Sequence, residues 1–278
     1  MPANSIVRRL VKRPLARFQW TPAYRLAQAA AMAWDIRTGA WSEPELDLIT
    51  HAVQPGESAL DIGANFGLWS YHLARATGPK GRVLAFEPVP FTYRCLRLVA
   101  KILRMVNVEM LAVGCGEQRA RVRFLAPAQD SGAISAGLVH LAGRGDRGEA
   151  SAHERASCGA ELWCDVVALD ELLADLPGLS FVKCDIEGSE LFAFRGAERL
   201  IDEHLPSVVC EIDPSFVEGF GLALEEVVGF FWAKQYELFR YDQHPPRLCR
   251  VLATRDLAAG NYLFVHPSRL GRFAGLLV

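Results

Sequence analysis

Short apolar segments typical of buried strands alternate with amphipathic segments typical of helices along most of the chain. Residues 58–62 and 82–86 are short, largely apolar runs, and each is followed by a helical pattern, over residues 68–76 and 90–103. Strands that alternate with helices in this way specify a mainly parallel sheet with helices on both faces. We therefore predict an α/β fold, and we expect its ligand site at the carboxyl ends of the strands.

The same alternation continues to the end of the chain, with one interruption. Residues 129–160 are rich in Gly, Ser, Ala and Arg, and they predict a long loop that is either functional or a surface insertion. No internal repeat is present, so we predict one domain over residues 42–278, preceded by a basic helical extension over residues 1–41. Further strands are expected at 106–113, 181–184, 208–212, 236–241 and 261–265, and further helices at 189–201 and 224–232.

The composition excludes several classes of protein. Of the 278 residues, 51% are hydrophobic and 22% are charged, with a net charge of −2, which is unlike a disordered chain or a basic nucleic-acid binder. No apolar run approaches the roughly 18 residues that span a membrane. The 7 cysteines include no C-x-x-C pair, so we expect reduced thiols rather than a zinc site or disulfides. We predict a cytoplasmic protein with no nucleic-acid partner.

The amino-terminal segment is basic. It contains no acid before Asp35, and its charges recur too often for the apolar region of a secretory signal. One interpretation is weak peripheral contact with anionic lipid or an acidic partner. The simpler interpretation is a first helix that packs on the domain. The basic residues of this segment are Arg8, Arg9, Lys12, Arg13, Arg17 and Arg25.

Two acidic positions follow the first two predicted strands. Asp61, Gly63, Asn65 and Gly67 belong to the turn after the first strand, where the glycines allow a close approach of backbone to ligand. The turn is not the dinucleotide fingerprint, because Asn65 stands where a further glycine is expected. Glu87 follows the second strand, where an acid can bind both hydroxyls of a ribose. Together these residues indicate a nucleoside ligand that carries positive charge.

Three blocks of sequence resemble the signatures of the FkbM methyltransferases. They are residues 61–67, 85–90 and 182–190, with supporting blocks at 167–173, 194–197 and 261–265. The resemblance implies a Rossmann-like class I methyltransferase fold, with a seven-stranded, mainly parallel sheet whose last strand is antiparallel and with helices on both faces. It implies methyl transfer from S-adenosylmethionine to a small-molecule or glycan acceptor. The acceptor group it implies is most often a hydroxyl of a sugar, a polysaccharide or a natural product.

The resemblance also assigns residues to parts of the methyl donor. It implies that Asp61, Gly63, Asn65 and Gly67 hold the methionine portion and that Glu87 holds the ribose. Residues around Ala112, after the third strand, would lie along the adenine.

Methyl transfer to a hydroxyl requires that the acceptor oxygen be aligned and that its proton be removed. Lys183, Asp185 and Glu187 close the fourth strand at the expected cleft, and Glu211 closes the next one. Adjacent parallel strands lie about 4.8 Å apart, so Asp185 and Glu211 could bind one Mg²⁺ that acts as a Lewis acid. The metal-free alternative uses Asp185 or Glu187 as general base, paired with Lys183. Glu187 and Glu190 could instead stabilise the next helix.

Three other functions remain as alternatives. An N-methyltransferase on the same scaffold would need a weaker base. A NAD-binding oxidoreductase is disfavoured by the missing glycine and by the absence of a Tyr-x-x-x-Lys pair. A degenerate binding module is disfavoured because Asp61, Gly63, Glu87, Asp185 and Glu187 are all intact.

Overall fold

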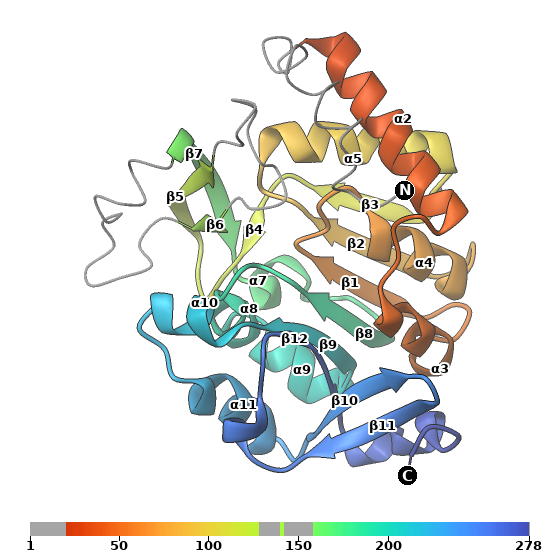
Figure 1. The fold of residues 1–278 in the computed structure, drawn as a ribbon, viewed down its shortest axis with the longest axis vertical. Helices are drawn as coiled ribbons and strands as arrows, with labels where there is room; N and C mark the ends of the chain where they lie inside the picture. The colour runs from red at the N-terminus through yellow and green to blue at the C-terminus, as the bar shows by residue number, and fades with distance from the viewer. Residues whose placement is uncertain (1–20, 128–139, 142–157, 278) are drawn as a thin grey trace.

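The computed structural model describes residues 21–127, 140–141 and 158–277 (Figure 1). Its central sheet has eight strands in the order β11-β10-β12-β9-β8-β1-β2-β3. Neighbouring strands from β3 to β9 pair in parallel, whereas β12 pairs antiparallel with both β9 and β10. The strands are β1 (Ser58–Ile62), β2 (Arg82–Phe86), β3 (Val108–Leu111), β8 (Leu179–Cys184), β9 (Ser207–Ile212), β10 (Glu237–Gln243), β11 (Pro246–Val251) and β12 (Gly260–Val265).

The α/β class and the mainly parallel sheet are therefore confirmed, but the sheet has one strand more than the seven predicted. The additional strand, β11, pairs antiparallel with β10 at the edge of the sheet. It begins at Pro246 after a second proline, Pro245, and consecutive prolines are more typical of a loop than of a strand. Proline is tolerated in an edge strand, because one side of that strand needs no ladder hydrogen bond.

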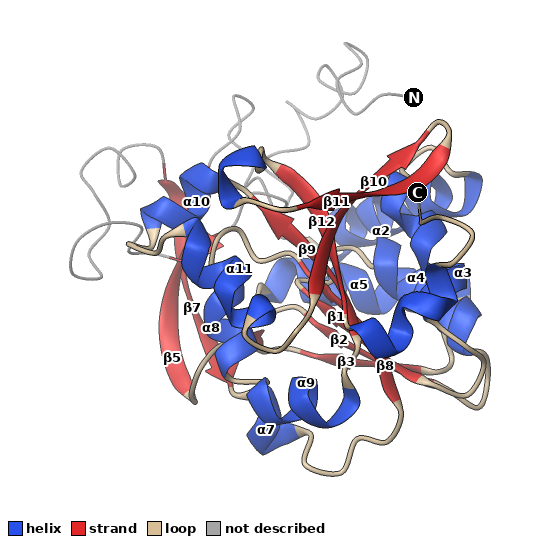
Figure 2. Cartoon of the chain, turned by 90° about the horizontal axis from the view of Figure 1, so that it is seen from below, coloured by secondary structure: helices blue, strands red, loops and turns tan. Residues whose placement is uncertain are grey.

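Helices cover both faces of the central sheet, and Figure 2 shows the two layers. Side chains alternate along each strand, so Ala59 and Val83 enter one core and Leu60 and Leu84 enter the other. The first core contains helices α2 (Pro22–Thr38), α3 (Ile49–Ala52), α4 (Leu68–Thr77) and α5 (Pro90–Leu103), and the 3₁₀ helices η2 (Pro44–Leu48) and η6 (Pro267–Phe273). The second contains α7 (Leu169–Leu172), α8 (Glu190–Arg195), α9 (Glu198–His204) and α11 (Leu224–Trp232).

Residues 189–201, predicted as one helix, form two. A glycine, Gly196, separates α8 from α9, and a Cβ added to it would lie 1.9 Å from the carbonyl oxygen of Gly116. This close backbone contact between α8 and the segment before β5 leaves no room for a side chain. The chain also forms α10 (Pro214–Gly219) and the short 3₁₀ helix η5 (Thr254–Asp256).

A second, smaller sheet lies at the end of the molecule toward which β1 and β2 point (Figure 1). Its order is β4-β7-β5-β6, with β4 (Gly114–Cys115), β5 (Ala120–Pro127), β6 (His140–Leu141) and β7 (Cys158–Val167). The sequence did not predict β5 as a strand, and β7 begins inside the segment predicted as a loop. The remainder of that segment, apart from residues 140–141, lies outside the described residues.

The amino-terminal helix α2 packs against α5, and its side chains Ala29, Ala33 and Ile36 are buried in the same core as α4. Of the basic residues of the amino-terminal segment, only Arg25 is among the described residues. None of the helices in the described part of the chain combines the length and apolar character that a bilayer crossing requires.

Candidate active site

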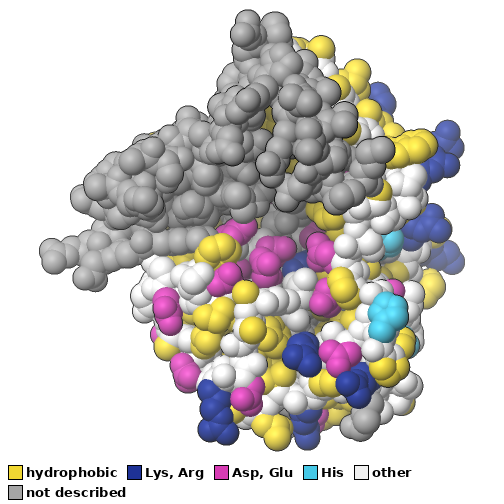
Figure 3. All heavy atoms as spheres, viewed as in Figure 1, with side chains coloured by type: hydrophobic (Ala, Val, Ile, Leu, Met, Phe, Trp, Pro, Cys, Tyr) yellow, Lys and Arg dark blue, Asp and Glu magenta, His cyan; other side chains and the backbone are white. Residues whose placement is uncertain are grey.

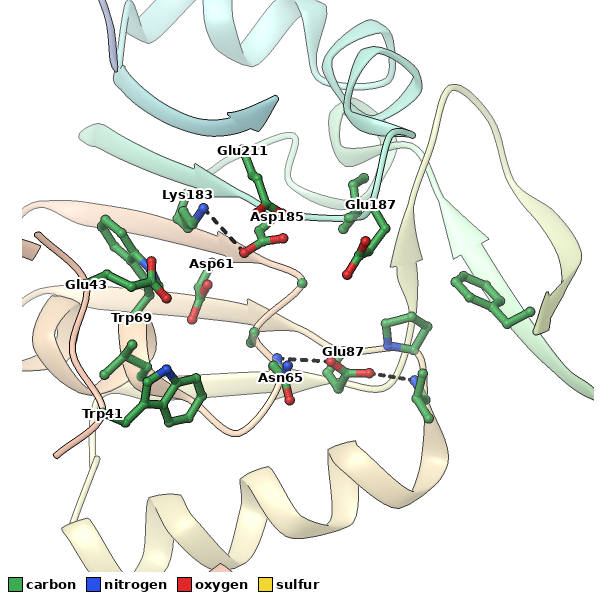
Figure 4. Close-up of a pocket in the computed structure, with 17 residues that line it drawn as sticks. Trp41, Glu43, Asp61, Asn65, Trp69, Glu87, Lys183, Asp185, Glu187 and Glu211 are labelled. Atoms are coloured by element: carbon green, nitrogen blue, oxygen red, sulfur yellow. Dashed lines mark hydrogen bonds and ion pairs between the residues drawn. The ribbon is translucent and has the colours of Figure 1, made fainter. Parts of the chain in front are cut away.

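A cavity of about 260 Å³ opens at the carboxyl ends of β1, β2, β8 and β9, where the parallel arrangement predicts a ligand site. Figure 3 shows acidic side chains gathered near the middle of this face, with a basic side chain visible between them. The lining residues in Figure 4 are Trp41, Glu43, Asp61, Gly63, Ala64, Asn65, Leu68, Trp69, Glu87, Pro88, Val89, Phe124, Lys183, Asp185, Ile186, Glu187 and Glu211.

The turn after β1 forms the floor of the cavity. Gly63 has a φ of +83°, and a Cβ at this position would lie 1.9 Å from the carbonyl oxygen of Asp185. Only glycine fits such a close contact between two backbone segments. Gly67 also has a positive φ, of +90°, but it does not line the cavity. Gly67 lies immediately before α4, where a Cβ would lie 2.7 Å from Cδ1 of Leu96, so its role is in helix entry.

Asp61 is the last but one residue of β1 and is 1% exposed. Its carboxylate accepts a hydrogen bond from the Ser70 hydroxyl on α4, which fixes its orientation. Burial, only partly offset by this bond and by the charge of Lys183, raises the pKa of Asp61 to about 6. A cationic group in the cavity would favour the ionised form of Asp61.

Glu87 connects the end of β2 to the turn after β1. Its carboxylate oxygens accept hydrogen bonds from the backbone N–H of Asn65, at 3.0 Å, and of Val89, at 2.8 Å. Burial outweighs these bonds and raises the pKa of Glu87 to about 7. The Oδ1 atom of Asn65 is buried without a hydrogen-bond partner, although the residue lines the cavity. An unsatisfied buried acceptor of this kind is suited to a donor group of a ligand.

Lys183 supplies the positive charge of the site. It is 1% exposed, and its Nζ atom lies 2.7 Å from Oδ1 of Asn261, 3.5 Å from Oδ2 of Asp185 and 5.4 Å from the ring centre of Trp69. Burial alone would lower its pKa, but the neighbouring carboxylates of Asp185 and Glu43 raise it. The acceptors and negative charge around Lys183 therefore favour its ammonium form.

Asp185 and Glu211 meet as a hydrogen-bonded pair of carboxyl groups. Burial raises the pKa of Glu211 to about 9, and the bond to Asp185 adds to this effect. Burial acts in the same direction on Asp185, but the charge of Lys183 and the hydrogen bond from Glu211 lower its pKa below the ordinary value. These shifts favour a pair that shares one proton, and the charge of Lys183 favours the ionised form of Asp185.

The Mg²⁺ site proposed for Asp185 and Glu211 stays a prediction. The structure brings these two residues together, and the ammonium of Lys183 lies 3.5 Å from Oδ2 of Asp185. Among the described residues, no group of three or more His, Cys, Asp or Glu side chains is arranged to hold a metal ion.

The loop after β8 carries two further acids with different roles. Glu187 has a φ of +60° and lines the cavity. Glu190 is buried, and its Oε1 atom accepts hydrogen bonds from the backbone N–H groups of Ile186 and Gly188, both at 3.0 Å. Glu190 thus holds the loop before α8 in shape, and it does not line the cavity.

A second, more apolar cavity of about 330 Å³ adjoins the first, and Gly63, Pro88, Phe124 and Ile186 line both. Ala112, predicted near the adenine, is exposed and lines neither cavity. The further lining residues of the second cavity are Ile62, Phe86, Gly114, Cys115, Gly116, Glu117, Gln118, Ala120, Val122, Val166, Ser189 and Phe192.

Sequence reasoning missed four side chains at or beside the first cavity: Trp41, Glu43, Trp69 and Asn261. Trp69 Nε1 donates a hydrogen bond to Glu43 Oε2 at 2.9 Å, and Asn261 accepts from Lys183. Trp41 and Glu43 stand before the first strand, and Asn261 lies in the last strand, so no local motif joins them to the site. The block 261–265 was recognised only as part of the family resemblance.

Comparisons with known proteins agree with this geometry. A model of the methyltransferase FkbM domain matches residues 61–238, which is more than half of the chain. A search of curated proteins gives no match. The match favours the methyltransferase prediction over the NAD-dependent alternative.

Several solved structures resemble the chain at low sequence identity. A methyltransferase FkbM from Methylobacillus flagellatus KT is 20% identical with a TM-score of 0.47, over 80% of this chain and 50% of that one, so this chain spans half of its length. A precorrin-6y C5,15-methyltransferase from Geobacter metallireducens GS-15 is 15% identical with a TM-score of 0.41, over 80% and 85%. A SAM-dependent methyltransferase from Aquifex aeolicus is 14% identical with a TM-score of 0.40, over 80% and 88%.

The region matched by the family model contains the glycine turn after β1, the buried Glu87 and the Lys183–Asp185 pair. The chain therefore belongs to the FkbM family of S-adenosylmethionine-dependent methyltransferases.

Proposed function

We propose that this protein transfers the methyl group of S-adenosylmethionine to a hydroxyl of a sugar, polysaccharide or natural-product acceptor. The observation that carries the proposal is the Asp185–Glu211 pair beside the cavity floor. It presents an ionised carboxylate where parallel strands β8 and β9 end. Such a group can accept a proton from an alcohol that is held against it.

The residues of the two cavities fit the methyl donor. The unpaired Oδ1 of Asn65 suits the ammonium of the methionine portion, and the backbone at Gly63 admits a ligand that a Cβ would block. The buried carboxylate of Glu87 suits the two ribose hydroxyls. The apolar second cavity, lined by Phe124 and Phe192, suits the adenine ring.

When bound, S-adenosylmethionine supplies a methyl group on a positively charged sulfur that already serves as the leaving group. Asp185 accepts the proton of the acceptor hydroxyl as the oxygen forms its bond to the methyl carbon and the carbon–sulfur bond breaks. Lys183 keeps Asp185 ionised before this step, and Glu211 orients it by hydrogen bonding. After the step the dyad holds two protons and returns one to water.

An amine acceptor is the second candidate. Among the described residues that line the first cavity, six are acidic and Lys183 is the only basic one. This charge disfavours a phosphorylated or carboxylated acceptor and accommodates either a neutral polyol or a protonated amine.

The two candidates are separated by a methylation assay with isotopically labelled methyl donor. Neutral glycans, polyols and amines of similar size are incubated with the protein, and the products are identified by mass spectrometry. We expect methyl ethers, formed at the same rate with and without EDTA because Lys183 is the cation of the site. Methylation of amines alone would contradict the O-methyltransferase proposal, and a rate lost in EDTA and restored by Mg²⁺ would contradict the metal-free dyad.

The affinity for the methyl donor is expected to increase with pH between 5.5 and 8. Glu87 has a pKa of about 7 and Asp61 one of about 6, so both are mostly neutral at the lower limit and ionised at the upper one. Ionised carboxylates attract the sulfonium, so the Kd of S-adenosylmethionine should fall as pH rises. S-adenosylhomocysteine lacks that charge and should show a smaller change. Calorimetric titration of both ligands at the two pH values measures the difference, and equal changes would contradict it.

A further inference from the structure

Two segments that lie outside the family match meet beside Lys183. Residues 41–45 precede the matched region and Asn261 follows it. The Nδ2 atom of Asn261 donates to Glu43 Oε2 at 3.5 Å and to Glu45 Oε2 at 3.4 Å, while its Oδ1 atom accepts from Lys183. These two segments thus adjoin the cavity from outside the range 61–238 that the family model matches.

Within residues 41–45, the Glu43 side chain makes the strongest contact with the site. Its Oε2 atom accepts the Trp69 indole N–H at 2.9 Å. Trp69 is itself fixed, because it is buried on α4 and stacks on Phe181 with ring centres 6.0 Å apart. This hydrogen bond therefore holds the turn that contains Glu43 against the buried Trp69 side chain. The neighbours Ser42 and Pro44 are exposed to solvent.

The same turn begins with Trp41, which lines the cavity. Its backbone N–H donates to the Asp35 carbonyl at 3.2 Å, at the end of α2. In the view of Figure 4, Trp41 lies on the same side of the cavity as Glu43 and Trp69, with Asn65 next to it and Glu187 on the far side. The indole is thus adjacent to the turn that faces the methionine portion of the donor.

We propose that Trp41 forms part of the methyl-donor site and that Glu43 is its positioning residue, through the hydrogen bond to Trp69. Trp41 and Glu43 then form a wall that retains the donor, in addition to the cavity residues within the family match. The inference rests on the proposed function, because it assigns the wall to the methionine end of S-adenosylmethionine. An immobile aromatic wall slows dissociation of the ligand that it covers.

The test uses the full chain and S-adenosylhomocysteine, and it requires no acceptor. Calorimetric titration of Glu43→Ala and of Trp41→Ala is expected to give a Kd about tenfold above that of the wild type, the effect of one lost charge-assisted bond or one aromatic contact. Glu43→Gln keeps an oxygen that can accept the Trp69 N–H and should restore most of the affinity. The double variant Glu43→Ala/Trp41→Ala should bind no more weakly than Trp41→Ala, because Glu43 acts through Trp41.

Glu45→Ala is the matched control. Glu45 contacts Asn261 from the same segment, but it neither lines the cavity nor bonds to Trp69. Its affinity should equal that of the wild type. The indole ¹H–¹⁵N signal of Trp69 should shift in Glu43→Ala but not in Glu45→Ala, which also shows that both variants are folded.

Three results would overturn the assignment: wild-type affinity in Glu43→Ala, equal weakening in Glu43→Ala and Glu45→Ala, or additive losses in the double variant. A Glu43→Gln variant as weak as Glu43→Ala would attribute the effect to charge and would also overturn it. If the folded wild type itself fails to bind S-adenosylhomocysteine, the proposed function fails, which is a different result from any of these.

Discussion

The variant Asp185→Asn is expected to lose between about 10²- and 10⁴-fold in kcat, the range that a general base contributes. The amide has nearly the shape of the carboxylate, but it cannot accept the proton of an acceptor hydroxyl. Asp185 is the ionised member of the dyad with Glu211 and lies 3.5 Å from the Lys183 ammonium. The rate is measured with labelled methyl donor and whichever hydroxyl acceptor the assay identifies.

The same variant should keep its affinity for S-adenosylhomocysteine within about threefold, because the proposed contacts of the donor are with Asn65 and Glu87. Asp213→Asn is the matched control. Asp213 lies two residues beyond Glu211 and caps α10 by accepting the backbone N–H of Ser215 at 2.8 Å, and asparagine caps a helix equally well. Normal turnover is expected in the control. An equal loss of donor affinity and turnover in Asp185→Asn would place Asp185 in the donor site instead.

The second large effect is expected at Gly63. An alanine Cβ at this position would lie 1.9 Å from the carbonyl oxygen of Asp185, in backbone with a φ of +83°. The β1 turn and the β8 loop would have to separate, so Gly63→Ala should lower the free energy of unfolding by more than about 4 kcal/mol, or prevent folding. Urea denaturation of the purified variant measures the loss.

Gly178→Ala separates the clash from the cost of the backbone conformation. Gly178 has a φ of +63°, but no atom lies within 4 Å of the position that its Cβ would occupy. This variant should lose only about 1 to 2 kcal/mol, the cost of a left-handed residue. Similar losses in the free energy of unfolding in Gly63→Ala and Gly178→Ala would show that the close contact between Gly63 and Asp185 does not limit stability.

The central sheet was largely predictable because its strands are short apolar blocks between helical patterns. The predicted bounds of β1, β2, α5 and α11 agree with the structure. The smaller sheet was less predictable from the sequence. Ala120, Val122 and Phe124 alternate with arginines along β5, and they line the second cavity. Alternation in a single strand is a weak signal when its partner, β7, lies more than 30 residues away.

The carboxylates of the candidate site were predictable because each lies at or just after the carboxyl end of a parallel strand, and parallel strands end on one edge. Asp61, Glu87, Asp185, Glu187 and Glu211 all line one cavity. Their protonation was not predictable, because burial and the bond between Asp185 and Glu211 depend on distances within the folded chain. The contact between Glu43 and Asn261 joins residues that are 218 positions apart in the sequence, so no local sequence pattern predicts it.

The most direct test of the whole account is calorimetric titration of the folded protein with S-adenosylhomocysteine and, separately, with NAD⁺. The account predicts micromolar binding of S-adenosylhomocysteine and no heat from NAD⁺. It also predicts that Glu87→Ala lowers the affinity for S-adenosylhomocysteine at least tenfold. This is about the effect of losing the hydrogen bonds from two ribose hydroxyls to a charged group. Absence of S-adenosylhomocysteine binding, or unchanged affinity in Glu87→Ala, would contradict the assignment of this cavity as the methyl-donor site.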